Sequence, residues 1–301
     1  MSATDLIQPF SFPELPVRGQ VVRLTGSWRA ILAEHDYPPV GTVLLGQMVV
    51  LTAMLAHSIK MQGSVVLQTH GDGPLRTAMA ECADRATLRG ILRFNATKDA
   101  TKDETESNAL PVNPLGKGTL AITLRPTHGT PYQGRVELSD EPFTVSIERY
   151  FERSEQLPTR IRIATTADQV VGVLVQRLPS EQPTTATDSD AWQRIARRAT
   201  ELSEVSLLKS PTEDLLRNTF VREVIRLNPP RPLAFGCSCS NDRAANALRT
   251  MGRTEVDALI DSEQRIEVSC EFCGARYDYD AIDARLLFET HTSSDAANPL
   301  H

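Results

Sequence analysis

The chain has 301 residues, of which 41% are hydrophobic and 23% are charged, and its formal net charge is −6. These values are typical of a globular protein with room for one large domain and a smaller one. Because phosphate binding needs a clustered basic surface, the acidic balance argues against a nucleic-acid partner.

Short strand-like runs separated by turn signals dominate the sequence from residue 17 to residue 179. Strands are predicted at residues 21–24, 64–69, 87–94, 119–124, 134–138, 160–165 and 170–176. Helices are predicted at residues 28–35, 40–59 and 144–156. Because the strands outnumber the helices and no regular βαβ alternation appears, we expect an α+β fold.

The segment 40–59 is apolar and long enough to be tested as a membrane span. It is interrupted at steps of five by Thr42, Gln47, Thr52 and His57, and no Lys/Arg asymmetry flanks it. We therefore expect a buried core helix, no membrane partner and, with no signal-peptide pattern in residues 1–10, a cytoplasmic protein. In that compartment, clustered cysteines are more often metal ligands or redox centres than structural disulfides.

Residues 180–189 (SEQPTTATDS) are polar and low in complexity, which predicts a flexible connector. A helix is predicted next, with an apolar stripe of Trp192, Ile195, Ala199, Leu202, Val205 and Leu208. A second helix is predicted to start at a capping box in residues 210–213 and to present Leu216, Phe220, Val224 and Leu227. Because such a helix pair needs packing, its stripe must rest on the N-terminal domain, on the cysteine module or on a partner. A permanently packed linker and a conditionally released one both remain open.

Two cysteine pairs, Cys237-Ser238-Cys239 and Cys270-Glu271-Phe272-Cys273, lie in the last part of the chain. They are expected in a module with a helix at residues 243–251 that begins at a cap in Ser240-Asn241-Asp242, a second helix at residues 254–260, and strands at residues 265–269 and 275–279. Four thiolates can bind one tetrahedral Zn²⁺, with Gly274 allowing the positive φ of a metal knuckle. The pairs could instead close two local disulfides, and a permanent zinc site and a redox switch both fit the spacing. A dithiol oxidoreductase site would need a thioredoxin-like βαβ context, which this segment lacks.

The other reactive residues do not form an enzyme site by sequence. Gly116-Lys117-Gly118-Thr119 lacks the first glycine of a phosphate loop, and the histidines occur in separate contexts. Cys82 is expected to be a buried strand thiol and not a fifth ligand. We therefore predict that the protein is not an enzyme.

The cysteine pairs resemble in their spacing the zinc centre of the redox-regulated heat-shock holdase family, the thirty-three-kilodalton heat-shock proteins. The resemblance extends to Gly71-Asp72-Gly73-Pro74-Leu75, to Pro131-Tyr132-Gln133-Gly134 and to residues 150–159 (YFERSEQLPT). It covers nearly the whole chain and stops at about residue 290.

The resemblance implies an ATP-independent chaperone, inactive while reduced and zinc-bound, that binds unfolded or partly folded client proteins and commonly dimerises when active. It implies one zinc ion on Cys237, Cys239, Cys270 and Cys273, and after oxidation and zinc loss the disulfides Cys237–Cys239 and Cys270–Cys273. The expected parts are an N-terminal core domain (1–180), a metastable helical linker (181–232), a zinc-binding redox switch (233–290) and a flexible tail (291–301). The alternative is a constitutive zinc-stabilised module that recruits a specific protein partner.

Overall fold

The structure is a computed structural model that describes residues 5–94, 114–139, 141–179 and 186–289. Its contacts divide the chain into two compact units, Met1–Gly236 and Cys237–His301. The predicted tail of residues 291–301, and residues 180–185 of the predicted connector, lie outside the described residues. Residues 186–236 pack with the first unit, and a separable linker over residues 181–232 stays a prediction.

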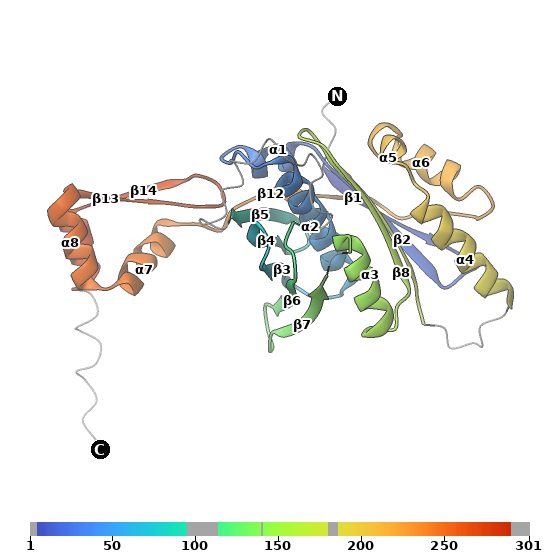
Figure 1. The fold of residues 1–301 in the computed structure, drawn as a ribbon, viewed down its shortest axis with the longest axis horizontal. Helices are drawn as coiled ribbons and strands as arrows, with labels where there is room; N and C mark the ends of the chain where they lie inside the picture. The colour runs from blue at the N-terminus through green and yellow to red at the C-terminus, as the bar shows by residue number, and fades with distance from the viewer. Residues whose placement is uncertain (1–4, 95–113, 140, 180–185, 290–301) are drawn as a thin grey trace, which may run out of the picture. The chain divides into compact units, whose positions relative to one another are not determined.

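Two six-stranded sheets form the framework of the first unit (Figure 1). The strands of the first sheet are β1 (Leu6–Phe12), β2 (Val17–Leu24), β8 (Thr159–Thr165), β9 (Val170–Arg177), β10 (Arg226–Leu227) and β11 (Arg231–Pro232). Its order is β10-β1-β2-β9-β8, with β11 also paired to β1. All these pairs are antiparallel, and the register places Val21 of β2 opposite Val173 of β9.

The second sheet has the order β12-β5-β4-β3-β6-β7. Its strands are β3 (Gly63–Gly71), β4 (Leu75–Ala83), β5 (Thr87–Phe94), β6 (Gly118–Pro126), β7 (Tyr132–Leu138) and β12 (Ala234–Phe235). Only the short β12 runs parallel to its neighbour, β5, and the other pairs are antiparallel. All seven predicted strands in this part of the chain are present, and β1 and β4 are additional.

Helix α2 (Pro39–Ser58) packs against both sheets and forms the centre of the main core (Figure 1). Glycines on the two sheets allow this close approach, because a Cβ at Gly90 would lie 2.9 Å from a Leu45 methyl and one at Gly172 would lie 2.5 Å from a Val50 methyl. By length and composition α2 could span a membrane, but most of its residues are buried in this core. The prediction of a buried core helix is confirmed.

Two shorter helices complete the inner part of the unit. Helix α1 (Gly26–Leu32) follows β2 directly, and α3 (Phe143–Arg153) packs against β7 and β8 (Figure 1). Both helices are shorter than predicted, because the chain turns at Ala33 and at Ser154.

A layer of three helices covers the other face of the first sheet: α4 (Ala186–Thr200), α5 (Glu204–Lys209) and α6 (Thr212–Thr219) (Figure 1). Trp192, Ile195, Ala199 and Leu202 of the predicted stripe are buried against residues of the first sheet. Of the three supports left open by the sequence, the stripe therefore rests on the N-terminal domain.

The same layer corrects several predicted boundaries. Helix α4 begins at Ala186, inside the predicted connector, and the helical stripe does not continue to residue 208. Ser203 caps a new helix, so the phase changes: Leu207 becomes buried and Val205 is 61% exposed. Because the chain here leaves the helical phase of α4, the assignment of Val205 to the apolar stripe was wrong.

Helix α6 also differs from its prediction at both ends. Its N-cap is Pro211, without a side-chain hydrogen bond, so the predicted capping box is absent. It ends at Thr219, where Phe220 packs against Phe10 and Phe12 and the chain then turns back to pair with β1. Val224 is consequently 65% exposed and is not part of an apolar helix face.

The second unit contains α7 (Asn241–Met251), α8 (Arg253–Glu263), β13 (Arg265–Ser269), β14 (Arg276–Asp280) and α9 (Ala281–Leu286). The first four were predicted within a few residues, and α9 was not. Its core is a small cluster that includes Leu248, Val256, Ile260 and Tyr279.

Candidate metal centre

Two separate pieces of backbone carry the four clustered cysteines. Cys237 and Cys239 lie in the extended segment before α7. Ser240 caps the helix, because its hydroxyl accepts a hydrogen bond from the main-chain N–H of Arg243 at 3.2 Å. Two residues apart on an extended strand, the two side chains can project to the same side. This helix cap agrees with the sequence prediction.

Cys270 and Cys273 lie in the turn that joins β13 to β14. Two main-chain hydrogen bonds close the turn, each 2.8 Å long. The N–H of Cys270 donates to the carbonyl of Ala275, and the N–H of Gly274 donates to the carbonyl of Cys270. Gly274 has a φ of 68°, the conformation that a side chain would disfavour. The predicted knuckle turn is therefore present.

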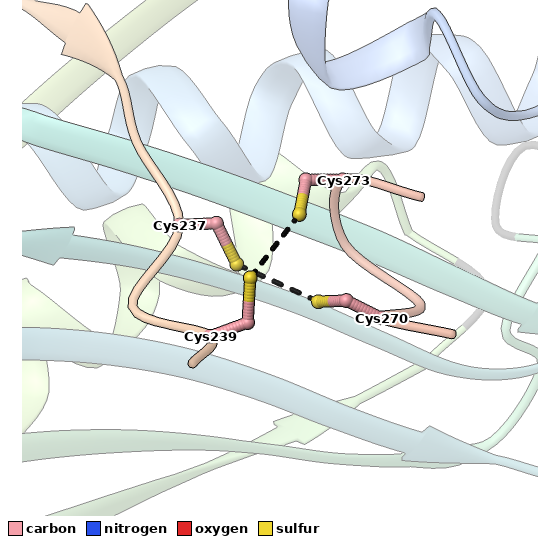
Figure 2. A group of neighbouring side chains, drawn as sticks. All are labelled: Cys237, Cys239, Cys270 and Cys273. Carbon is pink, nitrogen blue, oxygen red and sulfur yellow. Dashed lines mark hydrogen bonds between the residues drawn. The ribbon is translucent and has the colours of Figure 1, made fainter. Parts of the chain in front are cut away.

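The four sulfurs converge on one point (Figure 2). All lie within 4.8 Å of one another, and the contacts Cys237 Sγ–Cys270 Sγ and Cys239 Sγ–Cys273 Sγ are 3.6 and 3.4 Å. Sulfurs about 2.3 Å from a tetrahedral Zn²⁺ would be about 3.8 Å apart, so the cluster has the right size for one such ion. None of the five cysteines, all of which are described, is in a disulfide.

Hydrogen bonding and burial shift the pKa values of Cys237, Cys239 and Cys273 in different directions. A hydrogen bond from Tyr277 lowers the pKa of Cys239 to about 7. Burial raises the pKa of Cys273 to about 12 and also raises the pKa of Cys237. Without metal the cluster loses its first proton near neutrality, whereas a metal ion would hold all four sulfurs as thiolates.

Two tyrosines contribute to the site although the sequence prediction did not include them. Tyr277 of β14 contacts Cys239 through its hydroxyl, and Tyr279 Oη lies 2.9 Å from both oxygens of Asn241 at the start of α7. The pattern Arg-Tyr-Asp-Tyr-Asp after the second cysteine pair places both rings on one face of a strand. That alternation was the available signal.

Two arginines of this unit, Arg243 and Arg276, differ in their surroundings. Arg243 donates a hydrogen bond from Nη1 to the hydroxyl of Ser238, between the two cysteines of the first pair. Arg276 is paired with Glu267 at 3.4 Å and is 70% exposed. Arg243 is therefore the better placed of the two to offset thiolate charge.

Cys82 is not part of the cluster. It lies in β4, fully buried, where burial raises its pKa to about 12. The prediction of a buried strand thiol is confirmed, and the metal-binding group found among the described residues consists of the other four cysteines.

Comparison with known proteins places these features in a family context. A family model described as "Hsp33 protein" matches residues 5–280. A 33 kDa chaperonin of Nitrosococcus oceani is 37% identical over 302 residues, covering 100% of both chains. One from Azotobacter vinelandii is 36% identical over 293 residues, covering 96% of each.

A solved structure shares the fold. The 33 kDa chaperonin of Thermotoga maritima matches with a TM-score of 0.78 at 20% identity, covering 96% of this chain and 99% of that one. At this sequence identity, the match shows that the two proteins share a fold, and it carries no information about the metal centre.

Proposed function

Because the chain belongs to the Hsp33 family of non-enzymatic chaperones, we propose that it is a redox-regulated, ATP-independent holdase of the cytoplasm. Reduced and zinc-bound, it is inactive. Oxidation forms two disulfides, releases zinc and frees the linker, which exposes surface for unfolding client proteins. The active form is a homodimer, and the protein protects against oxidative and heat stress.

The observation that carries this proposal is the convergence of four sulfurs within 4.8 Å in a small unit. The all-thiolate donor set suits zinc, and its compactness suits a single ion. The ligands are Cys237, Cys239, Cys270 and Cys273, and zinc supplies a cross-link between the segment before α7 and the β13–β14 turn. In the reduced form these residues hold the two pieces of backbone together.

The proposed disulfides give oxidation a structural consequence. Cys237–Cys239 and Cys270–Cys273 each join residues of one segment, whereas the sulfur contacts in the structure run between the segments. Exchanging zinc for two local disulfides therefore removes the link between them. In a small unit, metal-binding free energy is folding free energy, so the unit opens when zinc leaves.

The three-helix layer offers the surface for clients. Trp192, Leu216 and Phe220 are buried between this layer and the first sheet, against residues that include Phe10 and Val173. Release of residues 181–232 would expose both apolar faces at once. Exposed apolar patches of this kind are what binding of unfolded chains, and dimerisation, require.

The test is to treat the reduced, zinc-loaded protein with peroxide at raised temperature while thiols, zinc and aggregation of an unfolding client are measured. We expect loss of the four cluster thiols together with release of zinc, peptide masses that place the disulfides within each pair, and a gain of holdase activity. Cys82→Ala serves as the matched control and should behave like the natural chain, because that thiol carries its proton at neutral pH.

A constitutive zinc-stabilised interaction module would give another result. Its partner binding would need zinc, and oxidation would abolish it. If the oxidised, zinc-free protein fails to suppress client aggregation, the holdase proposal is wrong.

A further inference from the structure

A cavity of about 210 Å³ opens in the first unit where α2 ends, beneath α3 and between the two sheets. Its walls are mainly apolar and include Leu55, Ile122, Phe151 and Leu174. Two sequence motifs with no part in the metal centre meet here. Tyr132 belongs to the first, and Tyr150, Phe151, Glu155 and Leu157 belong to the second.

One wall depends on a glycine. A Cβ at Gly134 of β7 would lie 2.4 Å from the hydroxyl of Tyr150, so only glycine lets this ring lie against the strand. Tyr150 in turn donates a hydrogen bond to Glu155 at 2.8 Å. Glu155 is exposed to solvent, where water and salt screen its charge.

The polar end of the cavity contains the guanidinium of Arg18. Its Nε and Nη2 donate to Gln176 Oε1 at 3.2 and 2.7 Å, and its Nη1 donates to the carbonyl of Ser58 at 3.4 Å. Gln176 is itself 2% exposed and is fixed by donating from Nε2 to Thr159 at 2.9 Å. The cation is thus held in a defined position.

These three contacts leave N–H groups of the guanidinium unused. Among the described residues, no carboxylate forms an ion pair with Arg18, whereas Arg89 and Arg149 of the same unit are each paired with a glutamate. A desolvated guanidinium favours a carboxylate, which it can bind through two parallel hydrogen bonds. An oriented cation at the end of an apolar cavity therefore lacks the anion that would complete it.

We propose that this cavity is a binding site for a small apolar chain that ends in a carboxylate, with the carboxylate on Arg18 and the chain between Leu55, Ile122 and Leu174. A cavity of about 210 Å³ is too small to enclose a long acyl chain, so it suits a medium-chain alkyl carboxylate better. Octanoate is the natural probe.

Calorimetric titration of the full-length reduced protein with octanoate tests the site. We expect saturable binding at one site with a Kd of about 0.1–1 mM. Octanol, which has the same chain and no charge, should bind at least about tenfold more weakly. Equal binding of octanol and octanoate would overturn the role of Arg18, and no saturable octanoate binding would overturn the site.

Two variants locate the ligand. Arg18→Gln should weaken octanoate binding by about tenfold or more, and Arg76→Gln, at an exposed position of β4, is its control. Ile59→Trp places a large ring in the cavity and should abolish binding, with Val43→Trp on the exposed side of α2 as its control. If Arg18→Gln does not fold, octanoate binding by Ile59→Trp still tests whether the ligand occupies this cavity. Binding by Ile59→Trp as tight as by the natural chain would contradict the proposal.

A free chain terminus presents the same chemistry as an alkyl carboxylate. A tripeptide of leucine with a free carboxylate is therefore titrated against bound octanoate, beside its amide. Displacement by the free acid alone identifies the site as a receptor for chain termini, and no displacement identifies free alkyl carboxylates as its ligands. Displacement by both peptides would contradict recognition of the carboxylate.

Discussion

Asp5 precedes β1, yet its carboxylate acts at the start of α1. It accepts hydrogen bonds from the main-chain N–H groups of Thr25, Gly26 and Ser27, the one from Gly26 at 3.2 Å. The N-cap residue Thr25 makes no such bond with its own side chain. A residue distant in sequence therefore satisfies N–H groups that a helix leaves without acceptors.

The pKa of Asp5 predicts how this cap responds to acid. Burial raises the pKa, but the hydrogen bonds from Ser27 and Thr25 outweigh it and hold the pKa below its ordinary value. A carboxyl whose pKa is depressed on folding stabilises the protein above its unfolded pKa of about 3.9 and loses that contribution as pH falls through the folded pKa. We expect Asp5→Ala to lower the free energy of unfolding by about 1–2 kcal/mol at pH 7, with the difference shrinking below about pH 4.

Urea unfolding followed by tryptophan fluorescence, to which Trp28 of α1 and Trp192 of α4 both contribute, measures this effect. Glu14→Ala is the control, because Glu14 is an exposed carboxylate in the turn after β1. A difference between Asp5→Ala and the natural chain that stays constant down to pH 3 would show that the charge is not involved.

At the scale of single residues, the features predicted from the sequence are those that depend only on neighbouring positions in the chain. The cap at Ser240 and the positive φ of Gly274 are local, and both are found. Asp5 and Tyr277 act on residues far along the chain, so their roles follow only from the pairing of strands. The cysteine cluster was foreseeable because its chemistry demands convergence whatever the intervening fold.

Among the elements, β1 was not predicted because Pro9 lies in its middle. Proline in a strand removes one ladder hydrogen bond and is tolerated at edges or irregularities. Here Pro9 lies in the gap between the registers of β10 and β11, and its carbonyl accepts the N–H of Asn228 at 2.9 Å. The position without an N–H therefore faces the gap between β10 and β11, where no ladder hydrogen bond is lost. The residues around Pro9 in the sequence do not reveal this gap.

Strand β4 was missed for a different reason. Its sequence, LRTAMAECA, is rich in residues of low β propensity. Neighbours β3 and β5 nevertheless pair with it along most of its length, and Glu81 forms a salt bridge with Arg89 of β5. Tertiary pairing overrides local preference here.

The contact between the helical layer and the first sheet depends on a half-buried arginine. Arg23 of β2 donates from Nε to the Thr212 hydroxyl at 2.9 Å and from Nη2 to the Ser210 carbonyl, at the junction of α5 and α6. Loss of a charged hydrogen bond to a partly buried partner costs about 1.5–3 kcal/mol. Arg23→Met should therefore raise the fraction of molecules with a released layer by tenfold or more.

Thermolysin cleavage of the reduced protein measures this release, because proteolysis follows the population of the open form when opening is fast. We expect Arg23→Met to be cut within α4–α6 at least about tenfold faster than the natural chain. Arg29→Met is the matched control, since Arg29 pairs with Asp168 at 3.2 Å on the surface, where both side chains are mostly exposed. Equal cleavage rates for the two variants would mean that Arg23 does not hold the layer.

At the scale of the whole molecule, the two units differ in how they are stabilised. The first unit has a large core around α2 and a second core under the helical layer. Over the described residues 237–289, the core of the second unit consists of eight buried residues, three of which are alanines. Units of this size rarely gain more than about 3–5 kcal/mol from apolar packing and usually need a metal or disulfides.

Removal of the metal should therefore unfold the second unit and leave the first intact. A structural zinc site contributes an apparent binding free energy of about 10–16 kcal/mol, well above what this core supplies. Hydrogen exchange of the reduced protein after chelation is expected to lose protection in α7, α8 and the β13–β14 hairpin while β2 and β9 stay protected. Adding zinc back should restore protection. Because reductant is present throughout, the result separates metal loss from disulfide formation, and unchanged protection in α7 without metal would show that packing alone holds this unit.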